Sequence, residues 1–303
     1  MAQNFDSSIT RLRPFFQPLL RRDPSGLSWL PALLRMGQAN PAFAREIAHD
    51  CGPLLPWVTR QRTRPDRALR TFGIESVALE ACFEYRLPPP REFLQFLITH
   101  PHLLSWPRED DLPGPNQRRR EELLGHHGFA AARAAAAEAL AELERVGAAG
   151  SNGKWWAFEG FTHADCLLET PALIVLIEGK RTEKLSASTR WFPQRNQLLR
   201  SLEVARAVAR QREKEFAVIL LAEDFMDGMS IEEIFGSLPH LTPRQRSEIL
   251  DRYLGCVTWR QALAEIFFPN TVEDAAMRIR QSSLWEMPLA APMVQHEFKG
   301  DST

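Results

Sequence analysis

Residues Thr162 to Glu183 read THADCLLETPALIVLIEGKRTE, and this stretch decides the expected fold. It contains the apolar run Leu173 to Ile177, whose β-branched content favours a buried strand over a helix. Thr170-Pro171 is a turn signal directly before that run. Ala164 to Glu169 is then the preceding strand, so the stretch predicts a β-hairpin.

Charged residues stand at the open end of this hairpin. Asp165 lies near the start of the first strand, and Glu178-Gly179-Lys180 follows the apolar run. Residues two apart on a strand share a face, so Glu178 and Lys180 project together while Gly179 leaves its carbonyl available. A short turn brings Asp165 back beside Glu178. Oxygen atoms are the ligands that Mg²⁺ prefers, and a bound metal ion lowers the pKa of its water, so a phosphodiester-hydrolysing metal site is predicted.

A plainer interpretation of Glu178 and Lys180 is a solvated strand edge with a cross-strand ion pair. The spacing alone does not separate the two interpretations. The context favours the metal site, because these charges end an apolar run that is expected to be buried. Buried ionisable groups are costly unless they are paired or bound to a metal.

Asp165 followed by Glu178-Gly179-Lys180 at the end of an apolar strand resembles the PD-(D/E)XK, or restriction-endonuclease-like, nuclease superfamily. The resemblance implies an α/β (α+β) fold, with a central mixed sheet flanked by helices. Its core runs helix, three-stranded meander, helix, strand. Besides the hairpin, the elements expected in that order are a helix at Phe129–Val146, a strand at Trp155–Phe161, a helix at Gln194–Arg210 and a strand at Glu215–Ala222.

The resemblance also implies roles for individual residues. Asp165 and Glu178 would bind Mg²⁺ or Mn²⁺, and Lys180 would position or activate the attacking water. Many relatives carry a glutamine near the start of the second helix, and Gln194 and Gln197 are the candidates in this chain.

Two positions depart from the superfamily pattern. Ala164 stands where the motif has proline, and Gly179 stands where an aliphatic residue is common. Neither change removes a side-chain ligand, so the expected metal site is retained.

Charge gives a local signal rather than a global one. The net charge is −1, which does not argue for a nucleic-acid partner. From Arg181 to Glu215, however, the sequence contains nine basic and four acidic residues, directly after the expected metal site. We expect Arg190, Arg195 and Arg200 to hold a phosphate backbone. The alternative is a solvated helix face.

The remaining sequence predicts three regions: a helical region over residues 1–115, the nuclease core over 116–228 and a helical region over 229–303. Pro107 to Gln117 reads as a linker. In the last region, helices that start after Thr242 and Thr258 resemble a helix-turn-helix, but a helical hairpin that packs against the sheet is the favoured interpretation, because no basic recognition face is present. The four cysteines are widely separated and predict reduced thiols in a cytoplasmic protein. No apolar run has the length of a membrane span.

The expected function is a Mg²⁺- or Mn²⁺-dependent nuclease with nucleic acid, DNA above all, as its substrate. A homodimer is left open. The competing hypotheses are a non-catalytic nucleic-acid-binding or scaffold protein with the same fold, and a structural helical protein whose sheet is incidental.

Overall fold

A five-stranded mixed sheet forms the centre of the computed structural model, which describes residues 8–55, 83–105, 114–148, 153–181, 183–226 and 229–267. The strand order is β1-β2-β3-β4-β5; the first three strands are antiparallel, and β4 and β5 each run parallel to the strand before. The strands are β1 (Phe83–Leu87), β2 (Thr162–Glu169), β3 (Leu173–Gly179), β4 (Glu215–Ala222) and β5 (Tyr253–Thr258). The helices are η1 (Ser8–Leu12), α1 (Arg13–Arg22), α2 (Leu30–Arg35), α3 (Pro41–Asp50), α5 (Arg91–Thr99), η4 (Pro101–Leu103), α6 (Gly114–Leu123), α7 (Phe129–Val146), α8 (Gln197–Gln211), α9 (Ile231–Ser237), α10 (Pro243–Leu250) and α11 (Trp259–Phe267).

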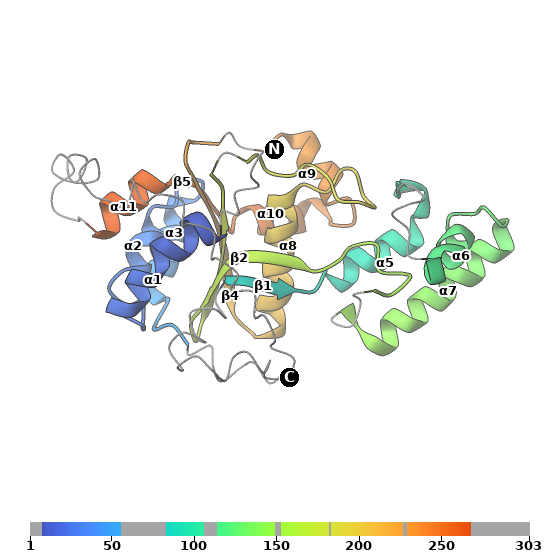
Figure 1. The fold of residues 1–303 in the computed structure, drawn as a ribbon, viewed down its shortest axis with the longest axis horizontal. Helices are drawn as coiled ribbons and strands as arrows, with labels where there is room; N and C mark the ends of the chain where they lie inside the picture. Colours follow the sequence, from blue (N-terminus) through green and yellow to red (C-terminus); the bar gives the residue numbers. More distant parts are fainter. Residues whose placement is uncertain are drawn as a thin grey trace, which may run out of the picture.

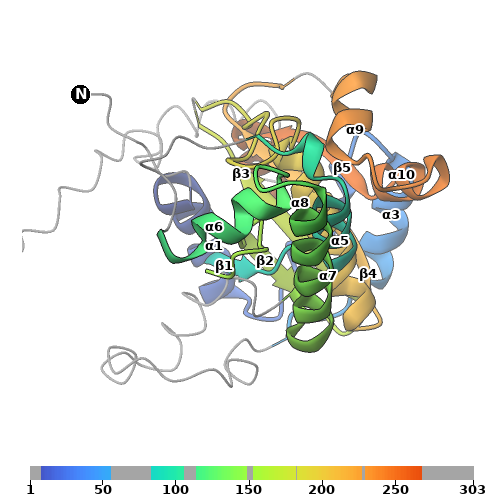
Figure 2. The same cartoon turned by 90° about the vertical axis from the view of Figure 1, so that its right-hand side faces the viewer.

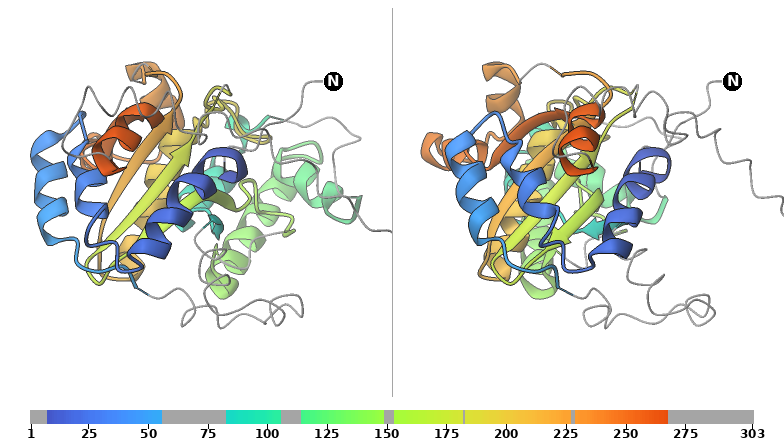
Figure 3. Two further views of the ribbon diagram at one scale, coloured as in Figure 1. Left: turned by 60° about the vertical axis from the view of Figure 1, so that its left-hand side comes forward. Right: turned by 90° about the vertical axis from the view of Figure 1, so that its left-hand side faces the viewer.

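Helices cover both faces of the sheet. Helices α1, α2, α3 and α11 lie on one face, and α8 with α9 and α10 lies on the other (Figures 1 and 3). Helices α5, α6 and α7 extend away from the sheet on the α8 side, as Figures 1 and 2 show. The sheet and the helices packed directly on it share one hydrophobic core, and a second core lies between α5 and α7.

The two central strands are buried on both faces, which explains their continuous apolar sequences. Every residue of β3 is buried, as is every residue of β4 after Glu215. Parallel neighbours with helices on both sides leave no strand face for water, so alternation of polar and apolar residues is not needed. The expected α/β class, a mixed sheet flanked by helices, is therefore confirmed.

Several predicted elements have the expected bounds. The helix Phe129–Val146 and the strand Glu215–Ala222 begin and end as predicted, and the two hairpin strands differ by two residues or fewer at each end. The strand predicted at residues 155–161 is wrong, because this segment forms turns. The segment is rich in aromatic residues because Trp156 and Phe158 fill the second core, not because the segment belongs to the sheet.

The expectation that residues 1–115 and 229–303 contain only helices is also wrong. Strand β1 pairs with β2, and β5 pairs with β4, so the sheet takes strands from all three predicted regions. Both strands contain a residue with positive φ, Glu84 at φ 52° and Gly255 at φ 101°. Since β5 separates α10 from α11, neither the predicted helical hairpin nor the alternative helix-turn-helix forms.

Three other expectations concern thiols, the linker and membranes. Cys51, Cys166 and Cys256 are buried and form no disulfide within the described part of the chain, while Cys82 lies outside it. Most of the predicted linker also lies outside them, and its last residues belong to α6. In the described part of the chain, no helix has the length and apolarity needed to span a membrane.

Candidate metal and catalytic centre

The predicted hairpin forms and brings Asp165 and Glu178 together. Its turn is closed by Thr170, whose side-chain oxygen accepts the backbone N–H of Leu173 at 2.9 Å. The ladder aligns Cys166 with Ile177, and the same antiparallel register sets Asp165 opposite Glu178. A hydrogen bond joins the two side chains. We call Asp165 and Glu178 the carboxylate pair.

Helix α8 supplies two hydrogen bonds to the carboxylate pair. Ser201 donates its hydroxyl to Glu178 Oε1 at 2.6 Å, and Gln197 donates its amide to Glu178 Oε2 at 3.0 Å. These residues are four positions apart, so they lie on the same side of the helix. The helix begins where it does because the side chain of Asn196 caps it, accepting the backbone N–H of Leu198 at 2.9 Å.

Burial dominates the electrostatics of Glu178. Its side chain is fully buried, and desolvation raises the pKa of Glu178 above the usual glutamate value. The positive charges of Lys180 and Arg200 and the hydrogen bonds from Ser201 and Asp165 lower it, but only in part. Two neighbouring carboxyl groups in such a place do not readily ionise together unless a cation compensates their charge.

Lys180 and Gly179 occupy opposite sides of the end of β3. Lys180 is buried, and its charge acts on Glu178. Gly179 faces the other layer, where a Cβ atom would lie only 2.7 Å from Leu12 Cδ1 and 3.6 Å from Trp259 Cζ2. The close approach of the N-terminal helices therefore explains a glycine at this position. Its backbone N–H donates to Asp165 Oδ2 at 2.9 Å, which fixes that carboxylate beside the strand end.

The donor atoms suit a hard divalent cation. The carboxylate pair and the Gly179 carbonyl offer only oxygen, which is the ligand type of Mg²⁺ and Mn²⁺. Each oxygen of Glu178 already accepts one hydrogen bond and keeps a second lone pair. Among the described residues, no group of three histidine, cysteine, aspartate or glutamate side chains could hold an ion. Water and substrate oxygens would therefore complete the coordination shell, as is usual for Mg²⁺.

Gln194 does not lie at the carboxylate pair, in contrast to Gln197. Helix α8 starts at Gln197 rather than at Gln194, because the cap is Asn196. Gln194 instead lies against α9, where a Cβ atom on Gly236 would come within 3.1 Å of Gln194 Oε1. Only one of the two predicted glutamines thus reaches the site.

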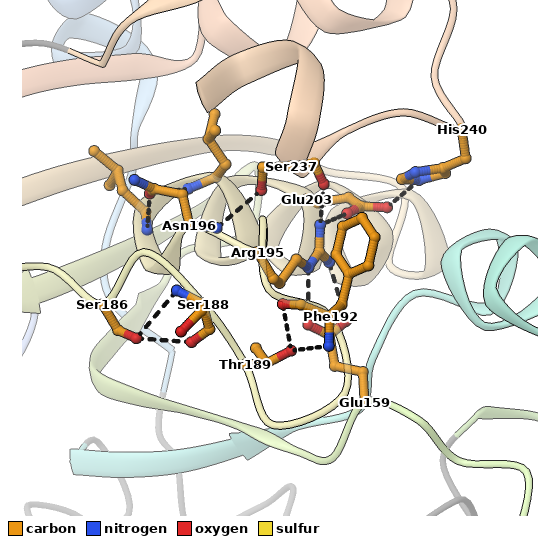
Figure 4. A network of polar contacts seen from close by, with 12 residues as sticks. Glu159, Ser186, Ser188, Thr189, Phe192, Arg195, Asn196, Glu203, Ser237 and His240 are labelled. Atoms are coloured by element: carbon orange, nitrogen blue, oxygen red, sulfur yellow. Dashed lines mark hydrogen bonds and ion pairs between the residues drawn. The ribbon is translucent and has the colours of Figure 1, made fainter. Parts of the chain in front are cut away.

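Arg195 is not a surface phosphate ligand, which corrects the prediction. Its side chain is fully buried between two glutamates. Arg195 Nε donates to Glu159 Oε1 at 2.8 Å, and Arg195 Nη1 lies 2.8 Å from Glu203 Oε2. His240 Nε2 lies 2.6 Å from the other oxygen of Glu203 (Figure 4). We call Glu159, Arg195, Glu203 and His240 the arginine cluster.

The Arg195 guanidinium has a carboxylate partner on each side. Burial alone would lower the pKa of Arg195, but the charges of Glu159 and Glu203 outweigh it and raise that pKa. Burial likewise acts to raise the pKa of Glu203, yet the charge of Arg195 holds it below the usual value. Arg195 also donates to the Ser237 carbonyl at 3.0 Å and stacks over the ring of Phe93. No local sequence pattern predicts this cluster, because Glu159 and Arg195 are 36 positions apart.

The other two predicted phosphate-binding arginines have different surroundings. Arg190 is exposed in the loop before α8. Arg200 is half-buried on α8, and its charge reaches Glu178. Both guanidinium groups thus remain compatible with an approaching anion, whereas that of Arg195 does not.

Comparisons with known proteins add no relative to this description. No family model matches the chain, and neither a curated protein nor a solved structure matches it. Any functional conclusion therefore depends on the geometry of the chain itself.

Proposed function

We propose that this protein is a Mg²⁺- or Mn²⁺-dependent nuclease that hydrolyses phosphodiester bonds, with DNA as the expected substrate. The observation that carries the proposal is the carboxylate pair, in which two acids meet on one sheet face in a largely buried site. Fully buried acids are rare, and strongly perturbed acids gather at functional sites. A cation bound between the two acids would add to the charge compensation that Lys180 and Arg200 supply in part.

The order of elements supports a restriction-endonuclease-like fold. A helix (α3), a meander of β1, β2 and β3, a helix (α8) and a parallel strand (β4) follow one another among the described elements. This order is similar to the core that the motif implies. Helices α5 to α7 are then an insertion between the first two strands of the meander, and α7 is not the helix that precedes it.

We assign each residue of the site a separate role. Asp165 and Glu178, with the Gly179 carbonyl, would hold the ion. When bound, such an ion supplies an acidified water and compensates charge on the phosphate. Gln197 and Ser201 fix the orientation of the Glu178 carboxylate through their hydrogen bonds. Lys180 brings a positive charge to the same end of β3, where it orients water or stabilises negative charge on the reacting phosphate.

Substrate would approach from the Asp165 side. Asp165 is half-buried, whereas Glu178 is fully buried, so Asp165 is the more accessible member of the carboxylate pair. Arg200, which is close enough to influence Glu178, and Arg190 in the adjoining loop are the proposed phosphate-backbone contacts.

A second candidate function is a non-catalytic scaffold or nucleic-acid-binding protein with the same fold. The observation that favours it is that Glu178 has no exposed surface and both of its oxygens already accept hydrogen bonds. In that case the carboxylate pair would be a structural, proton-sharing contact. Only the nuclease proposal requires that the pair bind a divalent ion and that cleavage depend on it.

A cleavage assay separates the two functions. Plasmid and single-stranded DNA are incubated with the full-length protein in EDTA, Mg²⁺ or Mn²⁺. We expect cleavage with a divalent ion only, and a loss of about 100-fold or more in Asp165→Asn, because a positioned electrostatic group is removed. The matched control is Asp224→Asn, since Asp224 is an exposed aspartate after β4, and it should cleave like wild type. The nuclease proposal fails if wild type cuts neither DNA with either ion, or if Asp165→Asn cuts equally well.

A further inference from the structure

A cavity of about 490 Å³ lies on the side of α8 that faces away from the carboxylate pair. Its walls are the prolines before α5, the end of α7 with Gly147 and Ala148, the C-terminal half of α8, and His240, Leu241 and Gln245. Glu203, a wall residue, is two positions after Ser201, which turns it about 200° around the helix axis. The cavity is therefore separate from the proposed nuclease site.

Apart from Glu203 Oε2, which forms an ion pair with Arg195 at 2.8 Å, two polar groups in the cavity wall are buried without a hydrogen-bond partner among the described residues. Arg206 is only 8% exposed, and its Nη2 atom is unpaired. The His240 side chain is 5% exposed, and its Nδ1 atom is also unpaired while Nε2 contacts Glu203. Such atoms are rare in folded proteins and call for a ligand or water to satisfy them. Both belong to residues that line the same cavity.

Two cations in the cavity wall form no ion pair among the described residues. Arg91 pairs with Glu144, and Glu203 pairs with Arg195. Arg206 and Arg210 have no such partner, and neither has the exposed acid Glu92. The two arginines are four positions apart on α8, so they lie on one side of the helix. Burial first, and then the charge of Arg210, lower the pKa of Arg206, while the charges of Glu203, Glu248 and Glu92 raise it in part.

We propose that this cavity binds a small molecule that carries one oxyanion group, a phosphate or a carboxylate, on an apolar or aromatic body. Arg206 and Arg210 hold the oxyanion, because guanidinium groups donate several N–H bonds in a geometry that matches both anions. Pro88, Pro89 and Leu241 form the apolar wall that contacts the body of the ligand. The volume lies in the range of sites for such ligands.

Calorimetric titration of the full-length protein with three probes tests this site. Phenyl phosphate and benzoate carry the two oxyanions on an aromatic ring, and benzyl alcohol is the neutral analogue. The titrations are made in EDTA without DNA, so that the result does not depend on the proposed nuclease function. We expect at least one anion to bind with a dissociation constant at or below about 1 mM, and benzyl alcohol to bind at least tenfold more weakly. Which anion binds identifies the oxyanion group.

Variants locate the binding. Arg206→Gln should weaken anion binding about 10- to 100-fold, as expected for the loss of a charged hydrogen-bond donor. Arg210→Gln removes an exposed charge and should weaken binding as well. The control is Arg118→Gln on α6, whose side chain is 84% exposed and does not line the cavity. If Arg206→Gln loses its native circular dichroism, Arg210→Gln decides the test alone.

Three results would overturn the proposal. The first is the absence of saturable binding of both anions to wild type up to about 10 mM. The second is unchanged affinity in every folded variant of the two arginines. The third is binding of benzyl alcohol as tight as that of the anions, which would leave no role for the guanidinium groups.

Discussion

Helix α8 has a buried cluster of charged residues on each of two sides, and the two clusters differ in how their charges are arranged. In the arginine cluster, Arg195 lies between two glutamates and contacts each at 2.8 Å. In the carboxylate pair, an acid contacts another acid. Burial of ionisable residues is therefore not in itself a sign of a functional site. The informative feature is which group a buried acid contacts: an arginine for Glu203, and another acid for Glu178.

The pKa values of the two buried glutamates express this difference. Burial raises the pKa of Glu178, and nearby cations do not restore it. Burial acts in the same direction on Glu203, but the charge of Arg195 lowers that pKa below the usual value. The surroundings of Glu203 thus favour its anionic form relative to a glutamate in water, whereas those of Glu178 disfavour it.

The largest effect is expected from Arg195→Met. The substitution leaves Glu159 and Glu203 buried without their cation, so the free energy of unfolding should fall by about 3–5 kcal/mol. Urea denaturation followed by circular dichroism measures it. Arg190→Met, which removes an exposed arginine five positions earlier, should change stability by no more than about 0.5 kcal/mol. Equal stability of the two variants would mean that the arginine cluster does not stabilise the fold.

A smaller effect, on turnover rather than on folding, is expected from Lys180→Met. The side chain keeps its apolar stem and loses its charge, so the variant should fold and bind Mn²⁺ at pH 8. Its DNA cleavage rate should fall by about 100-fold, the scale for losing a positioned electrostatic group. Lys184→Met removes an exposed lysine nearby and is the control. Wild-type turnover in Lys180→Met would refute the role given to Lys180.

The smallest expected effect is a change of stability with pH, relative to wild type, that has opposite signs in Glu178→Gln and Glu203→Gln. Because the folded pKa of Glu178 lies above the ordinary glutamate value of 4.5, Glu178 stabilises the fold less as pH rises from that value through the folded pKa. Glu178→Gln should therefore gain stability relative to wild type over that window. The folded pKa of Glu203 is lowered, so its stabilisation is present above 4.5 and is lost as pH falls through the folded pKa. Glu203→Gln should lose stability relative to wild type as pH rises through that lower window.

Urea denaturation of both variants and of wild type, at several pH values without divalent ions, makes this comparison. Two slopes of the same sign would show that the carboxylate pair and the arginine cluster are electrostatically alike. The distinction between a metal site and a structural cluster would then have no basis.

The features that the sequence predicted correctly depend on short-range patterns. The spacing of apolar residues along α7 and the apolar run of β4 can each be recognised within one short segment of sequence. Both elements have the predicted bounds. The carboxylate pair was predictable because its two residues belong to one hairpin, whose turn fixes the register. Gly179 is also compatible with the site. The requirement for glycine there comes from the close approach of Leu12, which lies in another layer.

The features that were missed depend on contacts between distant segments. Strands β1 and β5 are short and acquire their role only by pairing with β2 and β4. Arg195 meets Glu159, 36 positions earlier, and no local pattern distinguishes a buried arginine from a solvated one beside a helix. The start of α8 was set by Asn196, a cap that excludes Gln194 from the helix.

The most direct test of the central claim, that the carboxylate pair binds a divalent ion, is anomalous scattering from crystals soaked in Mn²⁺. We predict one peak within coordination distance of both Asp165 and Glu178, none in the arginine cluster, and loss of the peak in Asp165→Asn crystals. Crystals in which no manganese lies at the carboxylate pair, and in which Asp165 still hydrogen-bonds Glu178, would contradict the account.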